Sequence, residues 1–131
     1  MILVDTSVLI DFLKGTKSET VEKLEWVLQK GIPFGINSFI FQEVLQGVTS
    51  EKEYTLLDSY LRTQRFYHLK DAIESYASAA RIYMDCRKKG ITVTSTIDCL
   101  IAVTALEHDL LLLHNDSDFA AIARVVPLKI Y

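Results

Sequence analysis

Short apolar segments alternate with segments of helical periodicity along the whole chain, and this alternation constrains the fold more than any other feature. The strand-like segments are residues 1–4, 32–36, 66–69, 110–113 and 128–130. Strands that are joined through helices pair in parallel, and both faces of such a sheet must be covered. The sequence therefore predicts an α/β fold with a mostly parallel sheet of about five strands and helices on both sides.

Apolar residues at helical spacing place the helices between these strands. The predicted helices are residues 8–15, 21–31, 38–47, 54–61, 71–90 and 97–108, with a short helix after 118. Asp71 and Glu74 form a capping-box-like start for the longest one, and Arg87, Lys88, Lys89 and Gly90 form a favourable end. Residues 91–94 have strand propensity, but we expect an extended loop because a helix follows directly.

The composition is that of one compact domain spanning residues 1–131. Half of the residues are hydrophobic, and 14 basic against 17 acidic residues give a net charge of −3, which excludes general coating of nucleic acid. The apolar start carries no basic segment, and no apolar run reaches the roughly 20 residues of a membrane helix. Cys86 and Cys99 lack the spacing of a zinc or redox motif. We expect a soluble cytoplasmic protein with two buried, reduced thiols.

Four acidic residues stand at unusual positions. Asp5 follows the first strand and Asp116 follows the strand at 110–113, so pairing of these strands would bring both carboxylates to one sheet edge. Asp98 lies in the first turn of a helix, and Glu43 lies inside an apolar helix. Each acid alone also suits a helix cap or a solvent-facing position. Together they fit one acidic cluster.

A cluster of this kind requires a cation or shared protons. Two ionised carboxylates about 4 Å apart repel by roughly 4 kcal/mol at an effective dielectric constant near 20. Oxygen ligands without His or Cys favour Mg²⁺ or Mn²⁺, which keep bound waters and polarise phosphodiesters. His68 and His108 do not form a metal-binding spacing with His114, and the basic residues 87–89 already suit a helix end.

The segments VDTSVLIDFL, QEVLQG, TIDCLIA and NDSDF, in this order and spacing, resemble the PIN-domain ribonucleases, in particular the VapC-type toxins of toxin-antitoxin pairs. The resemblance covers the whole chain. It implies a three-layer α/β/α sandwich and an endonuclease for single-stranded RNA that depends on Mg²⁺ or Mn²⁺. It also implies that Asp5 and Asp98 are the principal metal ligands and that Glu43 and Asp116 complete the site.

Further expectations concern the surroundings of these acids. Asp118 can replace or assist Asp116, and we prefer Asp116 because it lies closer to the strand end. Thr6 or Ser7 would orient a carboxylate or a bound water, and we expect one of them rather than Asp5 to cap the first helix. His114 stands where similar proteins often carry Thr or Ser, which leaves the surroundings of the ligands less defined.

The resemblance also implies a small VapB-type antitoxin whose segment covers the acidic cleft, and a homodimer. Three alternatives remain at this point. The chain can be a PIN-like RNA-processing nuclease outside such a pair, a magnesium-binding phosphotransfer or receiver-like module, or a protein that binds a structural ion without catalysis. A phosphatase of the haloacid dehalogenase type would carry a second Asp two residues after Asp5, and this chain has Ser7 there.

Overall fold

The computed structural model describes residues 1–131 and contains one five-stranded sheet in which every pairing is parallel. The strands are β1 (Ile2–Val4), β2 (Gly35–Ile36), β3 (Arg65–Phe66), β4 (Leu111–Leu113) and β5 (Lys129–Ile130). Their order across the sheet is β3-β2-β1-β4-β5. The predicted α/β fold with a parallel sheet is confirmed. Several strands are shorter than predicted, and β2 begins only after Pro33, which has no N–H for the ladder.

Seven helices connect the strands, as the periodicity predicted. They are α1 (Thr6–Leu13), α2 (Glu19–Gln29), α3 (Ser38–Gln46), α4 (Glu51–Leu61), α5 (Glu74–Lys88), α6 (Thr96–Glu107) and α7 (Ser117–Ile122). Helix α5 begins three residues later than expected, because Asp71 Oδ1 accepts the N–H groups of Ile73 and Glu74 before the helix starts. The segment before α6 is a loop, as expected.

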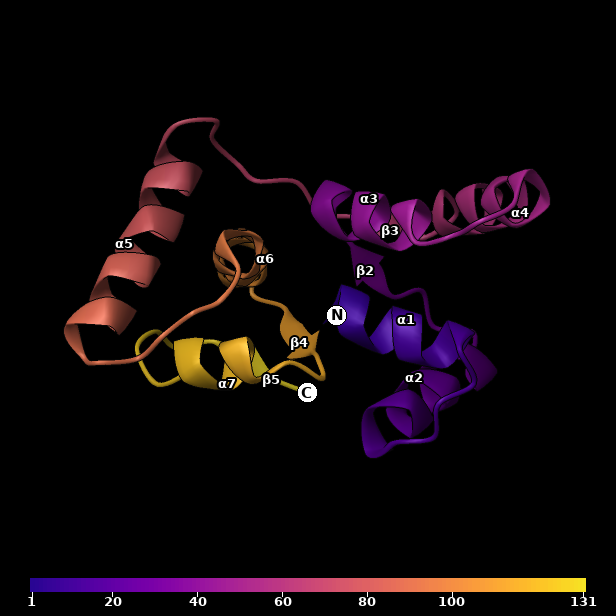
Figure 1. Ribbon diagram of the computed structural model, residues 1–131, viewed down its shortest axis with the longest axis horizontal. Helices are drawn as coiled ribbons and strands as arrows, with labels where there is room; N and C mark the ends of the chain where they lie inside the picture. The colour runs from indigo at the N-terminus through magenta and orange to yellow at the C-terminus, as the bar shows by residue number, and fades with distance from the viewer.

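The strand order produces the three layers. The chain moves outward from β1 to β3 and then returns to β4 on the opposite side of β1. Because parallel crossovers are right-handed, this reversal places the helices before β3 and those after it on opposite faces of the sheet. Figure 1 shows α1–α4 grouped on one side of the view and α5–α7 on the other. The reversal lies between β1 and β4, where open α/β sheets form ligand crevices.

The core is one cluster of 27 buried residues that includes residues of the neighbouring strands β1 and β4. Leu3, Val4 and Leu112 are completely buried, which explains why these strands read as unbroken apolar runs. Helix α6 is buried on most of its surface because it packs against α3, α5, α7 and β4. Cys86 and Cys99 are free and buried, as predicted. None of the helices combines the length and apolar character needed to cross a membrane.

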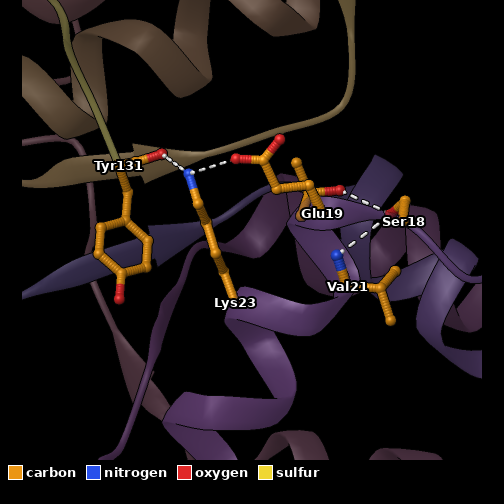
Figure 2. A network of polar contacts seen from close by, with 6 residues as sticks. Ser18, Glu19, Val21, Lys23 and Tyr131 are labelled. Atoms are coloured by element: carbon orange, nitrogen blue, oxygen red, sulfur yellow. Dashed lines mark hydrogen bonds and ion pairs between the residues drawn. The ribbon is translucent and has the colours of Figure 1, made fainter.

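The end of the chain is attached to α2, as Figure 2 shows. Lys23 Nζ donates a hydrogen bond to the backbone oxygen of Tyr131 at 3.1 Å and lies 5.5 Å from the centre of its ring. Ser18 caps the same helix, because its Oγ accepts the N–H of Val21 at 3.2 Å. These contacts hold the segment that follows β5 against the first half of the chain.

Gly35 in β2 is required by close packing. A Cβ atom there would lie 2.6 Å from Tyr67 Cε2 and 3.0 Å from the backbone oxygen of Ile2. We expect Gly35→Ala to lower the free energy of unfolding by about 1–3 kcal/mol, as overpacking does. Urea denaturation measures this effect.

Gly47→Ala is the matched control, because its Cβ would meet nothing closer than Val44 O at 3.5 Å and its φ is −81°. This substitution should leave stability unchanged or raise it by up to about 1 kcal/mol. Equal losses in both variants would contradict the close-packing explanation.

Candidate active site

The pairing of β1 with β4 brings two acidic residues to one edge of the sheet. Val4 pairs with Leu113, and the N–H of Asp5 donates to Leu113 O at 2.9 Å. Asp5 then starts α1, and Asp116 starts α7 three residues beyond β4. Both carboxylates therefore lie at the carboxyl ends of neighbouring central strands, in the crevice where the strand order reverses.

Two further helices bring the other predicted acids to the same place. Asp98 lies in the first turn of α6, and Glu43 lies in α3, which packs against both α1 and α6. Asp5, Glu43, Asp98 and Asp116 line one cavity of about 390 Å³. Only one of the nine lining residues, Ile10, is hydrophobic. The structure thus brings the four acids of the sequence prediction together, whereas Asp118 is not among the lining residues.

Hydroxyl groups at the start of α1 hold two of these carboxylates. Ser7 Oγ donates to Asp5 Oδ2 at 2.6 Å, and Thr6 Oγ1 donates to Glu43 Oε1 at 2.9 Å. The expectation that Thr6 or Ser7 caps α1 is wrong. Asp5 itself is the N-cap, because its backbone is extended and its Oδ2 accepts the N–H of Ser7 at 3.0 Å. A carboxylate has two oxygens, so capping a helix and lining the cavity are compatible roles.

Asn115 and Asp11 also line the cavity, and neither was predicted from the sequence as a site residue. The N–H of Asn115 donates to Ser7 Oγ at 3.0 Å, and its Nδ2 donates to Asp11 Oδ2 at 2.8 Å. The loop that carries Asp116 is thereby fastened to the helix that carries Asp5. The spacing held a signal, because Asp11 follows Ser7 by four residues and so lies on the same face of α1.

Asp118 lies behind the cavity, beside Asp98. Its Oδ2 accepts hydrogen bonds from Thr94 N at 3.0 Å, Thr94 Oγ1 at 2.8 Å and Ser95 N at 3.1 Å. One carboxylate oxygen each of Asp98, Asp116 and Asp118 lies within 4.8 Å of the others. Asp98 Oδ2 is buried and has no hydrogen-bond partner. An unpartnered buried oxygen among carboxylates fits a hard divalent cation, which takes oxygen ligands.

The electrostatics of the site favour protonation when no cation balances it. Burial, the hydrogen bond with Asp118 and the nearby carboxyl groups of Asp116 and Asp5 together raise the pKa of Asp98 to about 8. Burial also raises the pKa of Asp5 and of Glu43, although hydrogen bonds from Ser7 and Thr6 oppose this rise. At neutral pH the cation-free protein therefore carries a proton on Asp98, and a divalent cation can replace that proton.

Two neighbouring groups, Asp118 and His114, have lowered pKa values instead. Burial opposes ionisation of Asp118, but its hydrogen bonds with Thr94, Asp98 and Ser95 outweigh burial and lower its pKa. Burial lowers the pKa of His114, and its Nδ1 accepts the N–H of Asp116 at 3.2 Å. Asp118 is thus the ionised partner beside a protonated Asp98. The His114 ring supports the loop of Asp116 as a neutral acceptor.

These shifts predict how stability depends on pH in the presence of a chelator. A carboxyl group whose pKa rises on folding stabilises the protein below its unfolded pKa, and this stability is lost as the pH rises through the folded pKa. For Asp98 the window runs from about 4 to about 8. We expect stability to fall across it, approaching about 1.4 kcal/mol per pH unit for one proton.

Urea unfolding of the chelated protein at several pH values within this window measures the slope. Asp98→Asn removes the titrating group and should flatten the decline. Asp58→Asn, in helix α4 and outside the cavity lining, should leave the decline unchanged. A parent protein that gains stability from acid toward neutral pH, or an unchanged slope in Asp98→Asn, would contradict the assignment.

Comparisons with known proteins agree with this geometry. The family model described as PIN domain matches residues 2–125. The VapC ribonuclease Mb1587 of Mycobacterium bovis and the ribonuclease VapC11 of Mycobacterium tuberculosis are each 33% identical over 130 residues. Each alignment covers 98% of this chain and 96% of the relative.

Three solved structures with the same fold illustrate the likeness. VapBC2 from Rickettsia felis, bound to a promoter DNA fragment, has a TM-score of 0.74 at 18% identity, covering 100% of this chain and 98% of that chain. A toxin-antitoxin complex from Klebsiella pneumoniae has a TM-score of 0.68 at 23% identity, covering 99% and 100%. FitAcB from Neisseria gonorrhoeae has a TM-score of 0.67 at 20% identity, covering 100% and 96%. From the family match over nearly its entire length, together with the fold and the acidic cavity, we conclude that this chain belongs to the PIN-domain family and is a relative of the VapC ribonucleases.

Proposed function

We propose that this protein is an endoribonuclease that hydrolyses RNA phosphodiester bonds with Mg²⁺ or Mn²⁺, and that it is the toxin of a type II toxin-antitoxin pair. The observation that carries the proposal is the cavity lined by Asp5, Glu43, Asp98 and Asp116, in which a buried oxygen of Asp98 has no partner. The two mycobacterial relatives are named as ribonucleases, which supports the same activity.

The residues of the cavity have distinct roles in this proposal. Asp5 and Asp98 would be the principal ligands of the cation, and Glu43 and Asp116 would complete the site. Mg²⁺ or Mn²⁺, when bound, supplies positive charge that polarises the phosphodiester and stabilises the leaving oxygen. Asp5 is held for this role by Ser7, and Asp116 by the loop that Asn115 fastens to α1.

Glu43 is the acid that best suits proton transfer from the attacking water. It is only half-buried, and Thr6 holds one of its oxygens while the other remains free for a proton. Burial raises the pKa of Glu43, which makes its carboxylate a better base than a fully exposed Glu. The Thr6 hydroxyl keeps the side chain directed at the cavity from α3.

The phosphotransfer alternative is less favoured by this geometry. A receiver-like module needs a lysine at the acidic site, and the only lysine near the last strands, Lys129, pairs with Asp109 at 2.7 Å. Asp109 and Lys129 are both exposed, and neither lines the cavity. A PIN-like nuclease that processes RNA outside a toxin-antitoxin pair keeps the same chemistry, and only the partner separates it from the proposal.

Asp5→Asn should reduce RNA cleavage by roughly 100-fold or more, because the loss of a principal ligand removes several kcal/mol of transition-state stabilisation. Gel assays on total RNA, with Mg²⁺ and with a chelator, measure the cleavage. Asp58→Asn keeps the net charge matched and changes an acid that pairs with Arg62 on the surface. Cleavage by Asp5→Asn at the parent's rate, or undiminished cleavage in the chelator, would refute the metal-dependent mechanism.

Stability in the chelator separates the two roles of Asp5. Asp5→Asn keeps an oxygen that can cap α1 and removes a crowded charge, so this variant should melt above the parent. Asp5→Ala also loses the cap, which costs about 1 kcal/mol, so it should melt below Asp5→Asn. If both variants melt below the parent, charge crowding does not destabilise the cation-free site.

The proposed antitoxin and the cation compete for the same carboxylates. The similar structure from Klebsiella pneumoniae is described as a toxin-antitoxin complex. We propose such a partner for this chain, together with a homodimer and a cytoplasmic location. A basic side chain from the partner that enters the acidic cavity would offset its charge as the cation does. Excess Mn²⁺ should therefore weaken inhibition by the antitoxin, for which the protein encoded next to this chain's gene is the candidate to test.

The inhibitor concentration that halves cleavage should rise several-fold as Mn²⁺ increases at constant ionic strength. A parallel titration with a sodium salt, matched in ionic strength, controls for general screening, which weakens any pairing of charges. Inhibition that does not change with Mn²⁺ would show that the partner acts away from the carboxylates.

A further inference from the structure

We infer that Asp118 is a positioning residue that anchors the loop before α6 and so holds Asp98 in the cavity, and that it is not a ligand of the cation. The inference rests on the proposed function, because it assigns a role within the same site. It also decides between the two acids of the NDSDF segment by their contacts rather than by their distance from β4.

The anchor replaces a cap that α6 lacks. Ser95 is the N-cap residue of α6, but its side chain makes no capping hydrogen bond. The backbone N–H groups of Thr94 and Ser95, and the hydroxyl of Thr94, all donate instead to Asp118 Oδ2 from α7. The start of α6 is therefore held by a carboxylate from another helix, where an N-cap side chain of α6 itself would usually hold it.

The burial of Asp118 explains why these contacts are strong. Asp118 is only 3% exposed. A buried carboxylate is tolerated only where hydrogen bonds replace its hydration. Three donors from the loop converge on Asp118 Oδ2, and Asp118 does not line the cavity. Asp116 differs, because it lines the cavity and accepts one hydrogen bond, from the N–H of Asp118 at 2.9 Å.

The anchor acts on Asp98 through one turn of helix. The N–H of Asp98 donates to Ser95 O at 3.2 Å, so the position of Ser95 determines where the first turn begins. The first turn of a helix frays unless its start is held. Because Asp98 Oδ2 has no hydrogen-bond partner, the position of this oxygen depends on the turn that carries Asp98.

Paired substitutions test the inference through Mn²⁺ affinity, measured by titration calorimetry on the full chain. In Asp118→Asn an amide oxygen can still accept the hydrogen bonds of the loop, so the affinity should fall by less than about threefold. Asp118→Ala should lower it by about tenfold, as the loss of a supporting contact does. Asp116→Asn should lower it by more than about tenfold, because a ligand is changed.

Thr94→Val tests the anchor from the other side, because it removes one donor and leaves both acids intact. It should weaken Mn²⁺ binding by itself and add little in the Asp118→Ala background, since residues that share one contact do not act additively. Thr92→Val, an exposed residue of the same loop, is the matched control and should bind Mn²⁺ as the parent does. Additive effects of Thr94→Val and Asp118→Ala would overturn the inference.

A loss of affinity in Asp118→Asn equal to that in Asp116→Asn would make Asp118 a ligand and overturn the inference as well. Hydrogen exchange separates this failure from failure of the proposed function. The Thr94 and Ser95 amides should exchange faster in Asp118→Ala, whether or not the parent cleaves RNA. Parent-like exchange would overturn the anchor, whereas absent cleavage with faster exchange would refute only the proposed function.

Discussion

The pairing of β1 with β4 is the constraint on which the site depends. These strands are buried on both faces, so a shift of one residue would move Leu3 and Leu112 to the opposite helical layer, where the packing is built for other side chains. The register is therefore fixed by hydrophobic burial, and it places Asp5 against the end of β4. The core thus holds like charges together that would otherwise separate, at a cost of roughly 4 kcal/mol for each close ionised pair.

The fold offsets part of this cost by giving the same acids a second task. Asp5 and Asp116 are the N-caps of α1 and α7, and each accepts a backbone N–H that would otherwise lack a partner. Asp118 accepts two further backbone N–H groups at the entry of α6. Three helices therefore begin around the cavity, and N–H groups at their starts supply positive electrostatic potential among the acids.

Sequence periodicity predicted the order of the elements because apolar spacing differs clearly between strands and helices. It also identified Glu43, because an acid inside an apolar helix is unusual. The predicted cap of α1 is wrong because it followed from assigning Asp5 to the acidic cluster, and the folded chain gives Asp5 both roles. The contacts of Asp118 with Thr94 and of Asn115 with Asp11 join residues 24 and 104 positions apart, so only the folded arrangement reveals them.

The same acidity links the cation to the RNA in the proposed function. A cavity lined by carboxylates in a chain of net charge −3 repels a phosphodiester before any chemistry begins. A divalent cation changes the sign of the local potential, so it makes RNA binding possible as well as the reaction. Thermodynamic linkage makes this effect reciprocal, because RNA must then raise the affinity of the site for the cation by the same factor. The unpartnered oxygen of Asp98 is therefore one element of a site that becomes complete only with its cation and its substrate.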